Sequence, residues 1–341
     1  MIAPLPDQPE HIQQLCQLLE LGETPGELAA VAGGFHHRMW SLDTERGRFA
    51  IKQLADDMDM GDAATALRLN ATEVTAQAFA SRGVPALASL AHRGQHLQVL
   101  GHAGYLVYPW TDWHARGRND IADFHAVTVA GILARMHGAD IQVPALRELP
   151  TWPLTAKRVT DLVQLAQQRN VRDVDYLQAR LADILAVVEL QRTAQPMLAQ
   201  HQVISHGDLD HKNVLWSDAG EPLLIDWESA RPINPTYELL LEALDWSGIT
   251  AHFDARPFAS FLAAYVDAGG SIAAEMVEAA FNAILGAWVN WMLFNVGRAV
   301  GVEDARQRAI GSDQIDLALT TLLRLEKQIP RLRDIANRLA T

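Results

Sequence analysis

Apolar and polar positions alternate along much of the first part of the chain. After a helix-like segment at 7–22, the alternating runs "RMWSLDT" and "RFAIKQL" flank a turn at Glu45-Arg46-Gly47. Period-two alternation on both sides of a turn predicts an antiparallel hairpin. A helix is expected at 62–81, and "HLQVLG" and "GYLVYPW" predict two further strands. These residues should form a small antiparallel sheet with helices.

The pattern changes after Pro109, where apolar positions recur at helical intervals over long segments. One β-rich segment at 203–227 interrupts them. A polar, glycine-containing connector, "VYPWTDWHARGRND", accompanies the change and predicts a boundary. We therefore expect an α+β protein with two lobes, a sheet-containing lobe at 1–109 and a mainly helical lobe at 110–341.

Length and charge narrow the class of protein. A chain of 341 residues exceeds the size at which one core usually stops growing. The net charge of −13 argues against nucleic acid or an anionic membrane as partner. A single cysteine, Cys16, allows no internal disulfide, and the N-terminus lacks the pattern of a signal peptide. The apolar stretch 281–297 is interrupted by polar residues and is predicted to be a buried helix. We expect a cytoplasmic protein.

The polar cluster "HGDLDHKN" at 206–213 precedes a predicted hairpin, "NVLW", "SDAGEP", "LLID". If Trp216 pairs with Leu223, Asn213 lies opposite Asp226, and opposed residues are about 4.5–5.5 Å apart. An amide oxygen and a carboxylate would then meet at one end of the hairpin. Such oxygens suit Mg²⁺, with water and phosphate completing its coordination. A register slip of one residue would remove this pairing.

Asp208 lies on the same loop as Asn213. A carboxylate beside a metal-held phosphate can orient a hydroxyl and take its proton as the oxygen attacks. We expect His206 to pack and hydrogen-bond in support of the loop.

Phosphoryl transfer also needs a cation on the phosphates that are not transferred. Lys52 is the one lysine within a strand pattern, "FAIK", and a buried lysine needs a partner. Glu73 is the only acidic residue between Asp62 and Asp112, so we predict a Lys52–Glu73 ion pair. The glycine pair Gly33-Gly34 permits a turn whose backbone can approach a phosphate.

From about Gly33 to Trp246, the chain resembles the aminoglycoside phosphotransferase and choline kinase family, whose fold is that of protein kinases. The similarity rests on "HGDLDHKN", which matches the catalytic loop H-G-D-x-x-x-x-N, and on "LIDWE", which matches the metal-binding I-D-[FW]. The strand lysine in "FAIK" and the helix segment "LARMH" add to it.

The resemblance implies an ATP- or GTP-dependent, Mg²⁺-dependent kinase, with the nucleotide bound in the N-terminal lobe. It makes Asp208 the catalytic base, with Asn213 and Asp226 as metal ligands. It places Lys52 on the α- and β-phosphates, positioned by Glu73. Backbone groups of the hinge, Tyr108 to Trp110, would meet the adenine.

The sequence departs from protein kinases at two places. Gly207 stands where they usually have arginine, which argues against a phosphate-sensing switch. The stretch between Asp226 and the helix near Pro235 is too short for an activation segment and peptide platform. A small molecule with a hydroxyl group is the expected acceptor. The glycine turn also lacks the full G-x-G-x-x-G, so the contacts of His36 and His37 stay open.

The identity of the acceptor stays open too. Three residues of one predicted helix, Glu238, Glu242 and Asp245, share a face and could form an acidic wall for an aminoglycoside, beside Trp246, or be a solvated helix surface. Alternatively, Trp246 could join Trp288 and Trp291 in an aromatic box for a choline-type amine. Homoserine, methylthioribose and macrolide acceptors also occur in the family. A peptide kinase, or a catalytically silent nucleotide-binding regulator with the same fold, remains as a different class.

Overall fold

The chain forms two compact units. The computed structural model describes residues 9–23, 28–31, 37–55, 58–146, 154–172, 174–301 and 305–340. The first unit comprises 1–116, 141–148 and 206–231, and the second comprises 117–140, 149–205 and 232–341. This division differs from the expected lobes, because the segment with the polar cluster belongs by its contacts to the unit that contains the N-terminal sheet.

A five-stranded antiparallel sheet organises the first unit, as the alternating runs predict. Its strand order is β1-β2-β3-β5-β4. The strands are β1 (Ala29–Ala30), β2 (Arg38–Thr44), β3 (Gly47–Gln53), β4 (Gln98–Leu100) and β5 (Ala103–Pro109).

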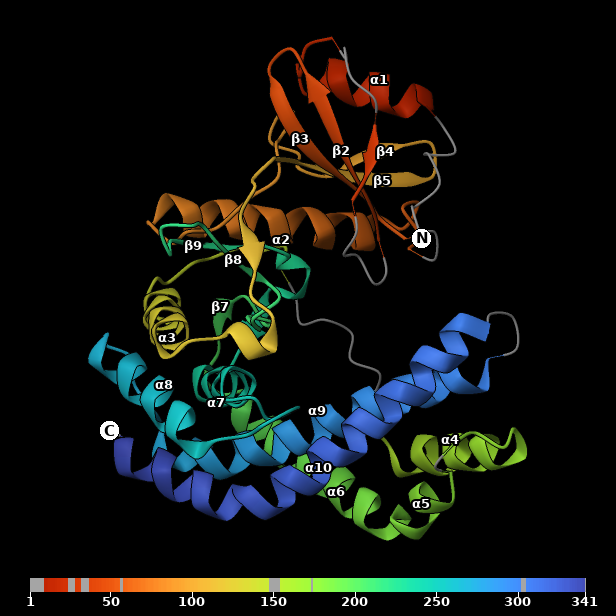
Figure 1. Ribbon diagram of the computed structural model, residues 1–341, viewed down its shortest axis with the longest axis vertical. Helices are drawn as coiled ribbons and strands as arrows, with labels where there is room; N and C mark the ends of the chain where they lie inside the picture. Colours follow the sequence, from red (N-terminus) through yellow and green to blue (C-terminus); the bar gives the residue numbers. More distant parts are fainter. Residues whose placement is uncertain are drawn as a thin grey trace. The chain divides into compact units, whose positions relative to one another are not determined.

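Helices cover both faces of this sheet (Figure 1). Helix α1 (Pro9–Leu18) packs on the face that carries Ile51 and Val107. Helix α2 (Ala63–Ser81) packs on the opposite face, where Leu106 and Tyr108 lie. Successive side chains of a strand point to opposite faces, so Lys52, which follows Ile51, is directed to the α2 face. The alternation of β3 therefore places the lysine.

The helix predicted at 62–81 is confirmed as α2, and its start has a clear physical cause. The carboxylate of Asp62 accepts hydrogen bonds from the backbone N–H groups of Ala64 and Thr65. These are donors that the first turn of a helix leaves without intrahelical partners. The helix ends at Ser81, shortly before Gly83, whose φ of 79° is left-handed.

A second, small sheet completes the first unit, with strand order β6-β8-β9. It is joined to the rest of the unit through Leu224, whose N–H donates to Pro85 O (2.7 Å) and whose carbonyl accepts from Leu87 N–H (2.9 Å). Phe79 of α2 stacks on Trp227 just beyond the sheet, with ring centroids 5.4 Å apart. These contacts explain why residues 206–231 belong to this unit. The elements are β6 (His114–Ala115), β8 (Val214–Trp216), β9 (Pro222–Leu224) and the 3₁₀ helix η2 (Trp227–Ser229).

The predicted register of the β8–β9 hairpin is wrong by one residue. Trp216 pairs with Pro222, rather than with Leu223. The cause is the loop: Ser217 and Glu221 close a three-residue turn that ends at Gly220, with φ 80°. A left-handed glycine at this place is typical of three-residue hairpin loops.

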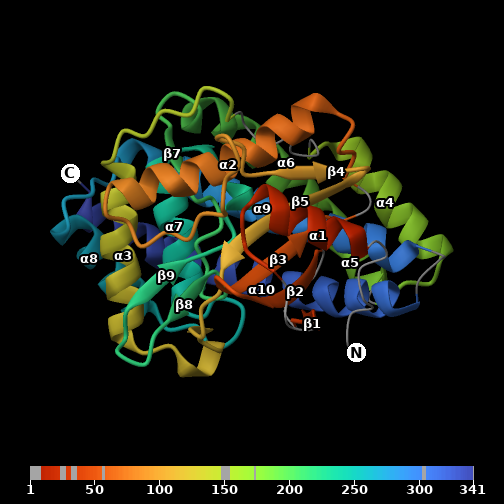
Figure 2. The same ribbon diagram turned by 90° about the horizontal axis from the view of Figure 1, so that it is seen from above.

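The second unit is mainly helical, and α9 and α10 pack along each other in it (Figures 1 and 2). The strands β7 (Val203–Ser205) and β10 (Arg231–Ile233) form a two-stranded sheet. The helices are η1 (Arg118–Asp120), α3 (Asp123–His137), α4 (Ala156–Gln168), α5 (Val174–Ala179), α6 (Leu181–Leu198), α7 (Pro235–Trp246), α8 (Ala255–Asp267), α9 (Ala274–Val300) and α10 (Ala305–Leu339). This confirms a sheet-containing N-terminal region followed by a helical C-terminal part.

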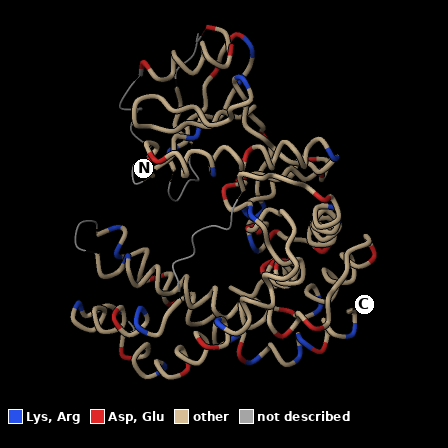
Figure 3. The backbone as a smooth tube through the Cα atoms, turned by 180° about the vertical axis from the view of Figure 1, so that it is seen from behind, with Lys and Arg blue, Asp and Glu red and all other residues tan. Residues whose placement is uncertain are grey.

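Helix α9 is longer than the apolar stretch from which it was predicted. Its length and composition would suffice to cross a membrane, but 61% of its most apolar window is buried inside the protein. It packs against α6, α7 and α10, so it is a core helix. Basic and acidic residues are interspersed along α10, as the colours of the backbone tube show (Figure 3).

Candidate active site

The polar cluster folds as a loop that leaves no space for a side chain at Gly207. This residue has φ 77°, and a Cβ atom there would clash with the guanidinium of Arg231 and the carbonyl oxygen of Ser229. The same guanidinium donates to Gly207 O (3.3 Å) and Ser229 O (2.9 Å). The loop therefore needs a glycine for steric reasons.

We expect Gly207→Ala to lower the free energy of unfolding by on the order of 3 kcal/mol, because left-handed strain and overpacking add. Gly94→Ala is the matched control. Gly94 has φ 80°, but a Cβ atom there meets nothing within 4 Å, so only the backbone strain of about 1–2 kcal/mol applies. Urea unfolding of both variants measures the difference, and equal losses would contradict the steric explanation.

The loop brings Asp208 and Asn213 together, as their spacing predicts. The side-chain nitrogen of Asn213 donates to Asp208 O (2.8 Å) and Asp208 Oδ2 (3.0 Å). With its nitrogen on Asp208, the amide directs its oxygen elsewhere, where it can serve as a ligand. His206 has the supporting role that we predicted: it is fully buried, packs on Trp227 and hydrogen-bonds to Ile225 O (3.0 Å).

Asp226 lies two residues after the end of β9, where the chain turns. Its backbone is left-handed, with φ 62° and ψ 61°. Its Oδ1 atom accepts a hydrogen bond from Lys52 Nζ at 2.7 Å, while its side chain keeps an exposed fraction of 38%. Because Ile225, rather than Asp226, is bonded to Asn213 O, Asp226 does not lie opposite Asn213. The carboxylate is nevertheless placed beside the lysine and accessible to a ligand.

The predicted ion pair between Lys52 and Glu73 is wrong. Glu73 Oε1 accepts from the hydroxyl of Tyr108 (2.7 Å) and Oε2 accepts from Ser89 N–H (2.8 Å). The two donors satisfy both oxygens of a carboxylate that is almost completely buried. Burial and the charge of Glu73 raise the pKa of Tyr108 well above its ordinary value, so the phenol keeps the proton that it donates.

Lys52 pairs instead with two carboxylates from the segment after β9. Its Nζ atom lies 2.7 Å from Asp226 Oδ1 and 3.0 Å from Glu228 Oε2. Burial by itself lowers the pKa of a lysine, but the two acidic neighbours outweigh it and leave the pKa of Lys52 raised. The lysine is therefore a fixed cation in this site.

Sequence reasoning did not find Glu228. This residue also accepts a hydrogen bond from His37 Nε2 (2.8 Å), whose Nδ1 accepts from Ala55 N–H (3.1 Å). Burial raises the pKa of Glu228, but His37 and Lys52 act in the opposite direction and leave it well below its ordinary value. The sequence signal that could have identified Glu228 is its position in "LIDWE", two residues after Asp226.

The expected hinge contacts of Tyr108 and Trp110 also need correction. Trp110 N–H donates to Arg48 O (3.0 Å), and Tyr108 pairs with Ala50 two positions back along the same ladder. In an antiparallel ladder, every second pair is hydrogen-bonded, so the backbone groups of both residues face β3. The Trp110 indole donates to Asp112 (2.8 Å). Within the predicted range Tyr108 to Trp110, the backbone of Tyr108 and the N–H of Trp110 are therefore engaged with β3, whereas Pro109 is not.

The glycine pair Gly33-Gly34 and His36 lie outside the described residues. His37 is the first described residue after them, and its contact with Glu228 resolves one question that the sequence left open.

The acidic wall proposed for the second unit is contradicted for most of its members. Glu238 is fully buried and accepts a hydrogen bond from His137 Nε2 (2.8 Å), and Glu242 and Trp246 are also buried. Sequence spacing placed the acids on one face correctly, but this face of α7 is directed into the protein. Asp245 is partly exposed.

The predicted aromatic box is also not formed as expected, because Trp246 is buried whereas Trp291 is 40% exposed. Trp291 stacks on Phe294 instead, with ring centroids 5.5 Å apart. Trp288 is partly buried.

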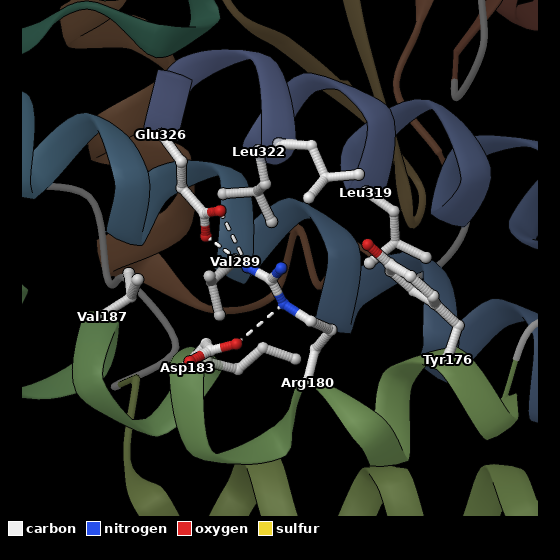
Figure 4. A pocket seen from close by; sticks show the side chains of 10 residues that line it. Tyr176, Arg180, Asp183, Val187, Val289, Leu319, Leu322 and Glu326 are labelled. Carbon is white, nitrogen blue, oxygen red and sulfur yellow. Dashed lines mark hydrogen bonds and ion pairs between the residues drawn. The ribbon is translucent and has the colours of Figure 1, made fainter. Parts of the chain in front are cut away.

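A separate pocket lies among α5, α6, α9 and α10 (Figure 4). The guanidinium of Arg180 is held in it by both oxygens of Glu326 (2.7 and 2.8 Å) and by Asp183 (2.9 Å). The lining is otherwise apolar, and its one cation is already paired with two acids. The pocket is therefore poorly suited to phosphate chemistry.

Together these features define a phosphotransferase with a kinase-like fold: the antiparallel sheet with its lysine, the loop with Asp208 and Asn213, and Asp226 after β9. Residues 27–281 match the family model described as the phosphotransferase enzyme family. The chain therefore belongs to this family, which confirms the resemblance seen in the catalytic loop and the "LIDWE" segment. A search of curated proteins gives no match.

Solved structures agree in fold. A spectinomycin phosphotransferase, in complex with ADP and spectinomycin, is 13% identical, with 92% of this chain and 98% of that chain covered and a TM-score of 0.67. An amicoumacin kinase, in complex with AMP-PNP and Ca²⁺, is 13% identical, with 95% and 93% covered and a TM-score of 0.62. A choline kinase from Streptococcus pneumoniae is 16% identical, with 92% and 98% covered and a TM-score of 0.57.

Proposed function

We propose that this protein transfers the γ-phosphate of ATP or GTP to a hydroxyl group of a small molecule. The observation that carries this proposal is the meeting of Lys52 with Asp226 in the same unit that holds the Asp208–Asn213 pair. A lysine for the phosphates, a base and oxygen ligands for a metal ion are the parts that phosphoryl transfer needs.

The loop prepares Asp208 to act as the base. Asn213 holds one carboxylate oxygen, so the group has a fixed orientation before the acceptor arrives. As the acceptor oxygen forms its bond to phosphorus, its proton passes to the carboxylate of Asp208. The bond between the γ-phosphorus and the bridging oxygen breaks, and a nucleoside diphosphate leaves.

The donor set fits a divalent cation. Asp226 offers an accessible carboxylate and Asn213 an amide oxygen, which are hard ligands of the kind that Mg²⁺ accepts. When bound there, Mg²⁺ would neutralise charge on the phosphates. Lys52, held by two carboxylates, would bind the phosphates that are not transferred.

The register of β5 indicates where the nucleotide base would bind. The backbone groups of Tyr108 face β3, so those of its neighbours Val107 and Pro109 face the other edge of β5. If the alternation continues past the end of the strand, Thr111 faces the same way. Val107 O indeed accepts from Leu90 N–H on that edge (2.7 Å). Pro109 offers only a carbonyl, and Thr111 offers the next N–H. An acceptor followed by a donor matches the amino group and ring nitrogen of adenine.

The acceptor we propose is a small polar molecule with a free hydroxyl and, in many cases, an amine. The solved relatives are phosphotransferases of spectinomycin, amicoumacin and choline, by their names. The net charge of −13 favours a cationic acceptor at long range.

Nucleotide consumption with a panel of amino sugars, choline-type amines, macrolides and amino-acid alcohols tests the proposal. We expect at least one compound to yield a phosphate ester in the presence of Mg²⁺, detected by mass spectrometry. A chelator should stop the reaction and added Mg²⁺ should restore it. Undiminished transfer with the metal removed would contradict the proposed metal requirement, and transfer only to generic protein substrates would contradict the small-molecule acceptor.

A further inference from the structure

We propose that Glu228, rather than the helix residue Glu73, is the residue that positions Lys52 for the nucleotide phosphates. This inference rests on the proposed function, because it assigns a role within the same site. It makes Glu228 a positioning residue that acts through Lys52 and also anchors His37, which follows the glycine segment.

Glu73 is engaged in hydrogen bonds with groups other than Lys52. Its two oxygens accept from the Tyr108 hydroxyl (2.7 Å) and from Ser89 N–H (2.8 Å), and it is 2% exposed. Moving it to Lys52 would leave a phenol and a backbone N–H buried without acceptors, which is unfavourable for each group. In this protein Glu73 therefore ties α2 to β5 and leaves the lysine to another acid.

Glu228 has the contacts that a lysine-positioning acid needs. One oxygen, Oε2, lies 3.0 Å from Lys52 Nζ and 2.8 Å from His37 Nε2. Since His37 Nδ1 accepts from Ala55 N–H, the ring proton is on Nε2 and is donated to Glu228. The acid thus joins the end of β3 and the start of β2 through two directed hydrogen bonds.

The backbone of Glu228 is itself held firmly. It lies in η2, whose Trp227 packs between Phe79 of α2 (5.4 Å) and His206 of the catalytic loop (4.6 Å). Trp227 is almost completely buried. The carboxylate is therefore presented to Lys52 from a packed element rather than from a mobile turn.

The two acids that contact Lys52 should differ in how strongly they attract it once a nucleotide and a metal ion are bound. Asp226 is the proposed metal ligand, and a carboxylate that is shared with a dication attracts the lysine less strongly. Glu228 then remains as the partner that keeps Lys52 in place. The lysine would in this way be positioned by an acid of the segment that carries the metal ligand, rather than by an acid of α2.

The direction in which one substitution changes nucleotide affinity distinguishes a positioning role of Glu228 from a simple effect of its charge. Glu228→Gln removes a negative charge beside the triphosphate. Because this relieves Coulomb repulsion, the charge change alone should strengthen nucleotide binding. If Glu228 positions Lys52, the same change should weaken binding. Titration calorimetry with a non-hydrolysable ATP or GTP analogue and Mg²⁺, without acceptor, measures this independently of the acceptor's identity.

We expect Glu228→Gln to raise the dissociation constant about tenfold, a loss of one charge-assisted contact. In steady-state assays, KM for the nucleotide should rise more than kcat falls. The matched control is Glu73→Gln, the same chemical change on the other acid. It should lower Tm, and its effect on nucleotide affinity should be at least about fivefold smaller than that of Glu228→Gln.

Two further variants, Glu228→Asp and His37→Ala, test the inference in case Glu228→Gln does not fold. Both should weaken nucleotide binding in the same direction as Glu228→Gln but less, since each leaves part of the network in place. Tighter or unchanged binding in Glu228→Gln, or a larger loss in Glu73→Gln, would overturn the inference. A folded wild-type protein that bound neither nucleotide analogue would instead refute the proposed function.

Discussion

Replacing Asp208 by Asn should lower turnover by about 10³-fold while the affinity for nucleotide stays within about twofold of wild type. The amide cannot take the proton of the acceptor hydroxyl, and general base catalysis contributes about 10²–10⁴-fold. The change is nearly isosteric, and Asn213 can still donate to the backbone carbonyl of residue 208 and to the amide oxygen that replaces Oδ2. The loop should therefore keep its shape.

Asp210→Asn is the matched control for this prediction, because it removes the same charge two residues further along the loop. Asp210 accepts from Lys212 N–H (2.8 Å) and pairs with the Lys212 ammonium, both local contacts within the loop. We expect turnover in Asp210→Asn to fall less than about tenfold. Steady-state kinetics and calorimetry compare the two variants. Equal losses in both would show that loop charge, rather than a base at position 208, determines turnover.

Local patterns in the sequence predicted the fold and the placement of Lys52 well. Alternation in β3 sends Lys52 to one defined face of the sheet, and the capping residue Asp62 marks the start of α2. The "HGDLDHKN" loop brought Asp208 and Asn213 together as expected, since five residues of loop leave little freedom. These features depend on neighbours in the chain, so the sequence contains the information that determines them.

The partner of Lys52 could not be predicted in the same way. Elimination within the N-terminal segment left only Glu73, but Glu228, far away in sequence, lies closer in space. The predicted register of β8–β9 was wrong because the left-handed Gly220 shortens the loop to an odd number of residues. The predicted exposure of one face of α7 was also wrong, because spacing shows that Glu238 and Glu242 share a face but does not show which face is buried. In each case the deciding contact is long-range or depends on one backbone conformation.

Replacing Asp226 by Asn should abolish metal-dependent transfer, with a loss of about 10³-fold or more in kcat/KM. The carboxylate is the proposed metal ligand, and an amide lacks the charge that the cation requires. Lys52 would keep Glu228 as a partner, so the buried ammonium stays neutralised and the site should remain folded. Titration of activity with Mg²⁺ should show a strongly raised requirement, and a normal Mg²⁺ dependence would contradict the assignment.

The backbone at Asp226 provides a control that separates charge from conformation. With φ 62° and ψ 61°, this residue is left-handed, a conformation that asparagine tolerates much better than alanine. Asp226→Ala should therefore lose as much activity as Asp226→Asn but unfold more readily, by about 1–2 kcal/mol. If the asparagine variant kept its Tm and lost its activity, the defect would lie in the missing charge. If both variants lost stability equally, the lost ion pair with Lys52 would account for the instability instead, because that contact disappears in both.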